Sequence, residues 1–216
     1  KMARGTNYSL LELPYYKKML EAPLYYMQSD FGMPPMGDVT GATSLENLAK
    51  YYEFPYHVYR ESLYAGLLNE IYQRVPRSET EALLYGEETI ETTEPLKLSD
   101  YHDDASSGLT VMHGKNGTCL LMNHGKFGGE HDHYDKLGIH FLVRGKPVVD
   151  DFGTVSYGAS HHYGYFKNTF THNTVCLDMA NQPPCNGKTI VYEKRPEGVF
   201  LEAHADWLHG AVTIDS

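Results

Sequence analysis

Several features are scarce in this chain of 216 residues, and each shortage excludes a class of protein. Three cysteines, Cys119, Cys176 and Cys185, are too few and too scattered to build a disulfide scaffold. No apolar run approaches the roughly eighteen residues that a membrane span needs. Acidic residues outnumber basic ones, 28 to 18, so the net charge is −10. The chain therefore lacks the basic surface expected of a nucleic-acid-binding protein.

Tyrosine and histidine are abundant, but they are unevenly placed. Eleven of the 18 tyrosines fall within residues 1–75, whereas eight of the 12 histidines fall within residues 113–172. Clustering of this kind is a compositional shift, and such shifts accompany changes of domain. The sequence therefore predicts two parts of different character.

The first part carries helical patterns, and we expect a helical domain over residues 1–77. Ser9 with Glu12 and Thr43 with Glu46 have the spacing of capping boxes, each before an apolar run. Later apolar residues recur at helical spacing. The expected helices cover 10–20, 45–54 and 59–75, and a long loop rich in Gly, Pro and Met covers 28–41.

Residues 78–100 have no strong period and predict a linker between domains. From residue 101 the pattern changes to short β-prone runs separated by glycine. These runs are 109–112, 118–122, 138–143, 147–150 and 174–177, with turns expected at Lys115-Asn116-Gly117 and Arg144-Gly145-Lys146. So few strands do not close a sandwich. We therefore expect residues 101–216 to be the N-terminal part of an antiparallel β-sandwich, in a fragment of a larger protein.

The residues best suited to chemistry lie in this second part. On a strand, residues two apart face the same way, so His131 and His133 would point into one site. Asp150 or Asp151, at the end of an apolar run, and His172, at the mouth of another, are further candidates. Two imidazoles and one carboxylate with an open position form a plausible zinc set. Taken singly, each residue is equally explained by turn capping or core packing.

Three motifs together resemble those of the heparinase II/III superfamily of polysaccharide lyases. They are Glu130-His131-Asp132-His133-Tyr134-Asp135, then Asp151-Phe152-Gly153, then Tyr165-Phe166-Lys167-Asn168-Thr169 with Thr171-His172-Asn173-Thr174-Val175. The last motif, followed by Asn181-Gln182-Pro183-Pro184, is most similar to oligoalginate lyases and exo-acting heparinases. The resemblance implies an α+β multidomain fold, with the end of an incomplete α/α toroid followed by the β-sandwich.

The resemblance also implies a reaction. It is exo-type cleavage of uronate-containing glycans, either heparin and heparan sulfate or alginate oligosaccharides, by β-elimination to unsaturated uronate products. Such a reaction removes the weakly acidic C5 proton and protonates the leaving O4. An acidic oligo- or polysaccharide and the remaining segments of the same protein are the implied partners. A periplasmic or secreted location is implied as well, although no signal-peptide pattern is visible.

The resemblance assigns roles to individual residues. His131 matches the catalytic imidazole. His133, Asp151 and His172 match the ligands of a structural divalent metal, with zinc as the expected ion and Asp150 as the alternative to Asp151. We expect Glu130, Tyr157 and Tyr165, which lie in or beside the motifs, to line the substrate site, with packing as the alternative role of the two tyrosines. The catalytic tyrosine and the carboxylate-binding groups of such lyases belong to the helical domain, and they match no residue here.

Two other functions remain open at this point. One is a cupin-type metalloenzyme, which also uses a His-x-His pair with a distant histidine. The other is a non-catalytic glycan-binding module. Basic residues around the motifs slightly favour a sulfated substrate over alginate; they are Lys126, Lys136, Arg144, Lys167 and Lys188.

Overall fold

The structure is a computed structural model that describes residues 9–39, 44–91, 95–103, 106–206 and 208–215. Two units can be separated. The helical unit consists of Lys1–Tyr25 and Thr43–Lys97, and the sandwich unit consists of Tyr26–Ala42 and Leu98–Ser216. None of the described helices is long and apolar enough to cross a membrane.

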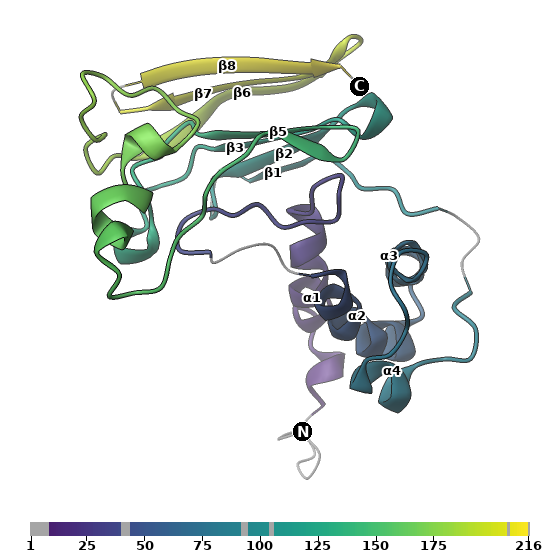
Figure 1. Cartoon of the computed structure of the whole chain (residues 1–216). Helices are drawn as coiled ribbons and strands as arrows, with labels where there is room; N and C mark the ends of the chain where they lie inside the picture. Colours follow the sequence, from purple (N-terminus) through teal and green to yellow (C-terminus); the bar gives the residue numbers. More distant parts are fainter. Residues whose placement is uncertain (1–8, 40–43, 92–94, 104–105, 207, 216) are drawn as a thin grey trace. The chain divides into compact units, whose positions relative to one another are not determined.

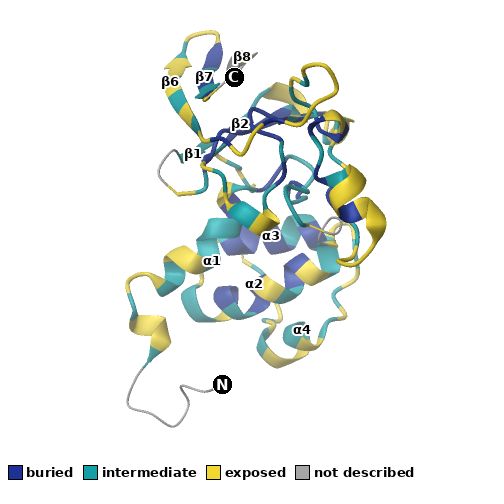
Figure 2. Cartoon of the chain, turned by 90° about the vertical axis from the view of Figure 1, so that its left-hand side faces the viewer, coloured by how far each residue is buried: buried dark blue, intermediate teal, exposed yellow. Residues whose placement is uncertain are grey.

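Within the described residues, the helical unit contains one 3₁₀ turn and four α-helices (Figure 1). They are η1 (Leu10–Glu12), α1 (Tyr16–Tyr25), α2 (Leu45–Tyr59), α3 (Ser62–Tyr72) and α4 (Thr80–Tyr85). Figure 2 shows buried positions on α2 and α3, and among them Tyr52 and Tyr64 bring their ring centroids to 5.7 Å. These tyrosines therefore serve packing between helices.

The first helix begins later than the sequence predicts. Residues 10–12 form only the turn η1, and the Ser9 side chain makes no capping hydrogen bond. Leu13 is extended, with φ −71° and ψ 129°, because it precedes Pro14, whose ring disfavours a helical conformation at the preceding residue. The helix expected over 10–20 was therefore wrong at its start, and α1 occupies Tyr16–Tyr25.

Helix α2 differs from its prediction at both ends. Ser44 caps it by accepting a hydrogen bond from the main-chain N–H of Asn47 at 3.2 Å, and Thr43, the predicted cap, lies outside the described residues. The helix continues past residue 54 to Tyr59, where Arg60 adopts a left-handed conformation with φ 52° and ends it. The helix predicted from residue 59 therefore starts only at Ser62.

A buried ion pair just before the predicted linker fixes the chain to α2. The Glu53 carboxylate is 0% exposed and accepts hydrogen bonds from Arg77 Nε at 2.7 Å, Arg77 Nη2 at 2.8 Å and the Tyr72 hydroxyl at 2.6 Å. Helix α4 then forms within residues 78–100 and packs on α2. This part of the predicted linker is therefore ordered helical structure.

In the part of the chain that the structure describes, the sandwich unit has eight strands in two antiparallel sheets, in the orders β1-β2-β3-β4-β5 and β6-β7-β8 (Figure 1). The first sheet comprises β1 (Tyr101–Asp103), β2 (Leu109–His113), β3 (Cys119–Asn123), β4 (Ile139–Val143) and β5 (Lys146–Val149). The second comprises β6 (Gly187–Arg195), β7 (Gly198–Ala205) and β8 (Leu208–Asp215). Both predicted turns are confirmed, since Asn116, Arg144 and Gly145 take positive φ between paired strands.

One predicted strand does not form. Residues 174–177 make only an isolated bridge between Leu177 and Ala180. The side chains of Val175 and Leu177 are exposed, so this β-prone run gains no burial that would favour a sheet position. The next strands along the chain are β6, β7 and β8, which form a second sheet that the sequence does not predict.

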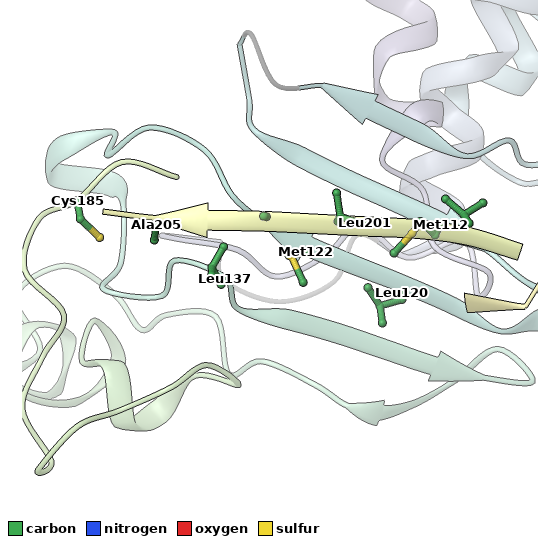
Figure 3. Close-up of a cluster of buried hydrophobic side chains, with 9 residues drawn as sticks. Met112, Leu120, Met122, Leu137, Cys185, Leu201 and Ala205 are labelled. Carbon is green, nitrogen blue, oxygen red and sulfur yellow. The ribbon is translucent and has the colours of Figure 1, made fainter. Parts of the chain in front are cut away.

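The core lies between the two sheets, and Figure 3 shows part of it. Its buried members come from β2, β3 and β7 and from two loops: Met112, Leu120, Met122, Leu137, Cys185, Val199, Leu201, Ala203 and Ala205. A second cluster covers the other face of the first sheet and includes Val111, Cys119, Leu121 and Leu142. Burial on both faces explains why every residue of β3 is buried.

The segment Tyr26–Ala42, which contains the loop predicted over 28–41 in the helical domain, belongs to the sandwich unit. Met36 packs on the second core cluster, and Met27 is fully buried. The Ser29 hydroxyl donates a hydrogen bond to the carbonyl of Gly117 at 2.8 Å. This segment places the Asp38 carboxylate beside His131 and His133.

Candidate active site

His131 and His133 do not lie on a strand, so that expectation was wrong. The 3₁₀ turn η3 (Gly129–His131) ends at His131, and Gly129 has φ 81°, a conformation incompatible with a regular strand. The His131 side chain is 77% exposed, whereas the His133 side chain is 0% exposed. The two imidazoles therefore have opposite environments, yet both contact the same carboxylate.

That carboxylate is Asp38, whose side chain is 6% exposed. Its Oδ2 lies 2.9 Å from His131 Nδ1 and 3.1 Å from the Tyr157 hydroxyl, and its Oδ1 lies 3.1 Å from His133 Nε2. Burial by itself would raise the pKa of Asp38, but hydrogen bonds from His131, His133 and Tyr157 lower the pKa below its usual value. Asp38 is therefore ionised at neutral pH.

The residues predicted to hold a metal come together beside this group. Asp151 Oδ2 lies 2.6 Å from His172 Nδ1, and the His133 and His172 ring centroids are 5.1 Å apart. Asp151 is almost fully buried, whereas the Asp150 side chain is 59% exposed. The structure thus places Asp151, rather than Asp150, with the two histidines.

Burial and charge set the ionisation of this group. Burial lowers the pKa of His133, and the hydrogen bond to Asp38 opposes that effect only in part. Burial would raise the pKa of Asp151, but the hydrogen bond from His172 brings it below its usual value. His133 is therefore neutral and Asp151 ionised at neutral pH, which are the forms that bind metal ions.

The fit of a metal to this group rests on unpartnered atoms. Within the described ranges, no group of three or more His, Cys, Asp or Glu residues is arranged closely enough to hold a metal ion. However, His133 Nδ1 and His172 Nε2 are buried nitrogens that have no hydrogen-bond partner. A buried polar atom without a partner costs roughly 1–3 kcal/mol. Two imidazoles and one carboxylate are also a donor set that zinc accepts.

The structure adds two histidines that the sequence analysis did not single out. The buried His162 begins a single π-helical turn, η4 (His162–Phe166); its Nδ1 lies 2.8 Å from Thr154 Oγ1 and its Nε2 lies 3.7 Å from Asp38 Oδ1. The buried His140, on β4, places Nε2 4.0 Å from Asp151 Oδ2. The high density of histidine in this region was the signal for both residues.

Asp38 was missed for a different reason. It lies far from the motifs in sequence, inside the predicted loop 28–41. Loops of that length without regular structure are uncommon and are usually functional or disordered. The length of the loop was therefore a signal, but it did not identify Asp38.

The three predicted substrate-binding residues have different surroundings. The Tyr157 hydroxyl lies 3.0 Å from His131 Nδ1. Glu130 has an exposed side chain, and its carbonyl accepts a hydrogen bond from Lys167 Nζ. Tyr165 packs edge-to-face against Phe166 and Phe170, with ring centroids 5.4 and 5.7 Å away. Tyr157 is therefore the member of this set that the structure brings into contact with the predicted catalytic imidazole.

An open pocket of about 320 Å³ lies beside His131. Its lining includes Ser107, Lys126 and Lys136. Lys136 is buried, and its Nζ donates a hydrogen bond to Asp132 Oδ2 at 2.7 Å. Volumes of this order are typical of ligand sites. Beside the imidazole, the lining of the pocket carries charges of both signs, from Lys126, Lys136 and Asp132.

Comparisons with solved structures show the same fold in known lyases. A heparinase III with methylated lysines has a TM-score of 0.70 and 18% identity, over 91% of this chain and 28% of that chain. The heparan sulfate lyase HepC from Pedobacter heparinus has a TM-score of 0.68 and 15% identity, over 87% of this chain and 28% of that chain. At these identities the likeness shows the fold alone.

Sequence comparison finds a curated relative and a family. An alginate lyase from Stenotrophomonas maltophilia is 30% identical over 133 residues, which are 56% of this chain and 18% of that lyase. This chain thus spans less than a third of the length of the relatives it matches. The family model "Heparinase II/III-like, C-terminal" matches residues 97–209, which include His131, His133, Asp151 and His172. The chain therefore belongs to the heparinase II/III-like family, as its motifs predicted.

Proposed function

We propose that this chain contributes the sandwich part of the active site of a polysaccharide lyase. The enzyme cleaves uronate-containing glycans by β-elimination and yields unsaturated uronate products. The observation that carries this proposal is the contact of the exposed His131 with Asp38 and Tyr157. Membership of the family and the names of its relatives support the same reaction class.

The chemistry follows from which nitrogen of His131 is occupied. Asp38 and Tyr157 both contact Nδ1, so Nε2 is left to accept the C5 proton of the sugar. Burial and the neighbouring Asp38 raise the pKa of Tyr157, so this phenol stays protonated at neutral pH. Tyr157 then serves as a proton donor toward the leaving oxygen. A positioned acid or base of this kind contributes on the order of 10²–10⁴-fold to the rate.

The proposed substrate is an acidic oligosaccharide that is cleaved in the exo mode. Lys126, in the pocket beside His131, suits a uronate carboxylate or a sulfate, whereas Lys136 is buried and bonded to Asp132. Because one relative is named an alginate lyase and another a heparan sulfate lyase, the proposal includes both glycans as substrates. We propose that the helical unit is the end of an α/α toroid. The remaining segments of the protein are proposed to complete the site. The protein is proposed to be periplasmic or secreted.

A divalent metal, zinc by the donor set, is proposed to bind His133, Asp151 and His172. Among the described residues, His133 and His172 each have a buried ring nitrogen without a hydrogen-bond partner, which supports these two as ligands. Asp151 contacts the other nitrogen of His172, Nδ1, so its assignment rests on the motif. When bound, the ion supplies structural cross-linking of three loops. His133 lies two residues after His131, so fixing it also fixes the turn that presents His131. Elemental analysis of the purified full-length protein tests the assignment, and a metal content near zero contradicts it.

The reaction is tested on the full-length protein with alginate, heparin and heparan sulfate supplied separately. The ultraviolet absorbance of the unsaturated uronate reports elimination directly. We expect product from at least one glycan, and His131→Ala to lower kcat/KM on the order of 10²–10⁴-fold. His161→Ala, a change at an exposed neighbouring histidine, is the matched control and should keep full activity. Glycan binding without product would show a non-catalytic module, and the cupin-type alternative already disagrees with the family match.

A further inference from the structure

The main chain around Asp38 is fixed from two sides. Its N–H donates a hydrogen bond to the His131 carbonyl at 3.3 Å, and the carbonyl of the next residue, Val39, accepts one from Thr154 N–H at 3.1 Å. Gly37 has φ 59°, and a Cβ there would lie 2.6 Å from the His131 carbonyl oxygen. The chain therefore passes tightly against the turn that carries His131, and Asp38 has little freedom to move.

Both carboxylate oxygens of Asp38 accept hydrogen bonds from the site. Oδ2 accepts hydrogen bonds from His131 Nδ1 and the Tyr157 hydroxyl, and Oδ1 accepts one from His133 Nε2. An ionised carboxylate can only accept, so each of these three atoms must carry the proton. His131 is then protonated on Nδ1 and His133 on Nε2. The lone pairs that remain are on His131 Nε2 and on the buried, unpartnered His133 Nδ1.

We propose that Asp38 is the positioning residue of this lyase site. It fixes the tautomers of both histidines, so that His131 presents Nε2 to the substrate and His133 presents Nδ1 toward the proposed metal. The inference rests on the proposed function for its catalytic consequence. Asp38 lies outside residues 97–209, the part that matches the family, and inside a segment that the sequence assigns to the helical domain.

The charge of Asp38 has a second effect on the reaction. When His131 takes the substrate proton, its ring becomes an imidazolium, and a buried carboxylate at Nδ1 stabilises that cation. The Asp38 carboxylate is 6% exposed, but the His131 ring is 77% exposed, so water screens part of this attraction. Asp38 therefore orients the base before proton transfer and stabilises it afterwards.

The first test needs no variant and no substrate. Nitrogen-15 NMR of the histidine rings in the full-length protein, near neutral pH, reports which nitrogen of each ring bears the proton. We expect His131 protonated on Nδ1 and His133 on Nε2. A spectrum with His131 protonated on Nε2 overturns the inference, whether or not the protein proves to be a lyase.

The second test uses kinetics on alginate and heparan sulfate oligosaccharides. Asp38→Asn offers one acceptor oxygen and one amide donor, so it cannot accept from all three groups. We expect kcat to fall on the order of 10²–10⁴-fold, with KM unchanged. Asp38→Glu, which restores the charge, should recover at least part of that loss. Asp30→Asn is the control in the same segment. The Asp30 carboxylate accepts a hydrogen bond from the main-chain N–H of Gly32 at 2.8 Å and does not contact the site, so this variant should keep the wild-type kcat.

The third readout is zinc affinity, measured by competition with a chelator. Carboxylates that orient a ligand histidine typically contribute 10–100-fold to metal affinity. Asp38→Asn should therefore bind zinc more weakly by about that factor, and Asp30→Asn should bind it as the wild type does. A wild-type kcat in Asp38→Asn overturns the positioning role. A wild-type protein without product on any glycan instead overturns the proposed function, and the NMR result still decides the role of Asp38.

Discussion

At the scale of single residues, His131 and His133 show how two neighbouring histidines take on different tasks. His131 is exposed and contacts Asp38 and Tyr157, whereas His133 is buried and faces His172. The exposed imidazole can reach a substrate. The buried one is part of the folded interior, so its removal leaves a cavity.

Alanine substitutions at these two residues should therefore have opposite effects on stability and on activity. His133→Ala should lower the free energy of unfolding by about 2–4 kcal/mol, because it deletes a fully buried ring and a proposed metal ligand. His131→Ala should change it by less than about 0.5 kcal/mol, as is usual for exposed positions, while abolishing most activity. Denaturant titration and steady-state kinetics on both variants measure this. Equal stability losses would count against the assignment of roles.

The surroundings of His113, on β2, predict how the stability of the protein depends on pH. Burial lowers its pKa below the ordinary value, and Asp100 opposes this only in part. The folded protein therefore keeps His113 neutral, whereas the unfolded chain takes up a proton below about pH 6.5. The stability contributed by this group is present above that pH and is lost as the pH falls through it.

His113→Phe removes this titration and keeps a large apolar ring on β2. The wild type should lose more stability than His113→Phe between about pH 7.5 and about pH 5.5. The difference between the two denaturation curves isolates His113 from the other buried histidines. Parallel loss in both proteins would mean that His113 is not held neutral.

The sequence identifies some site residues and misses others for a physical reason. His131, His133, Asp151 and His172 stand in motifs with defined spacing, so a resemblance can assign them. Asp38 meets them only because a distant segment folds against the sandwich. A contact of that kind depends on tertiary packing, which local patterns do not contain.

At the scale of elements, the helical unit depends on a pair that no helical pattern predicts. Arg77 binds the fully buried Glu53 through two nitrogens and also donates to the Glu87 carbonyl at 2.7 Å. The pair ties the end of α3 and the start of α4 to α2. Periodicity predicts where the helices lie, but it gives no indication of which charges they bury.

Arg77→Met should lower the free energy of unfolding by about 3–5 kcal/mol, because Glu53 would remain buried without its cation. Arg74→Met is the matched control, since Arg74 pairs with Glu70 at 3.9 Å on an exposed face and such pairs contribute about 0–1 kcal/mol. Thermal and denaturant unfolding of both variants measure the difference. Similar losses would mean that the Glu53 pair carries no special stability.

The segment Tyr26–Ala42 provides a second prediction at this scale. Gly37→Ala would place a Cβ 2.6 Å from the His131 carbonyl oxygen, at a residue with φ 59°. Strain at such a position costs on the order of 1–3 kcal/mol. Because the strain falls between Asp38 and His131, activity should fall together with stability. Gly158→Ala, at φ 88° but with open space around its Cβ, is the control, and full activity in Gly37→Ala would contradict the packing.

At the scale of the whole molecule, the sequence predicts the class of the fold better than its extent. Alternating runs and two turns correctly predict an antiparallel arrangement for β2 to β5. The second sheet was underestimated: β6 has a mixed exposure pattern, whereas β7, which alternates clearly between buried and partly buried residues, was overlooked. The second sheet contributes Leu201 and Ala203 to the core.

The central claim is that this site supports elimination rather than hydrolysis. Mass spectrometry of the products formed by the full-length protein tests it most directly. Elimination adds no water, so the account predicts product masses that sum to the mass of the substrate. Products whose masses exceed that sum by one water would contradict it.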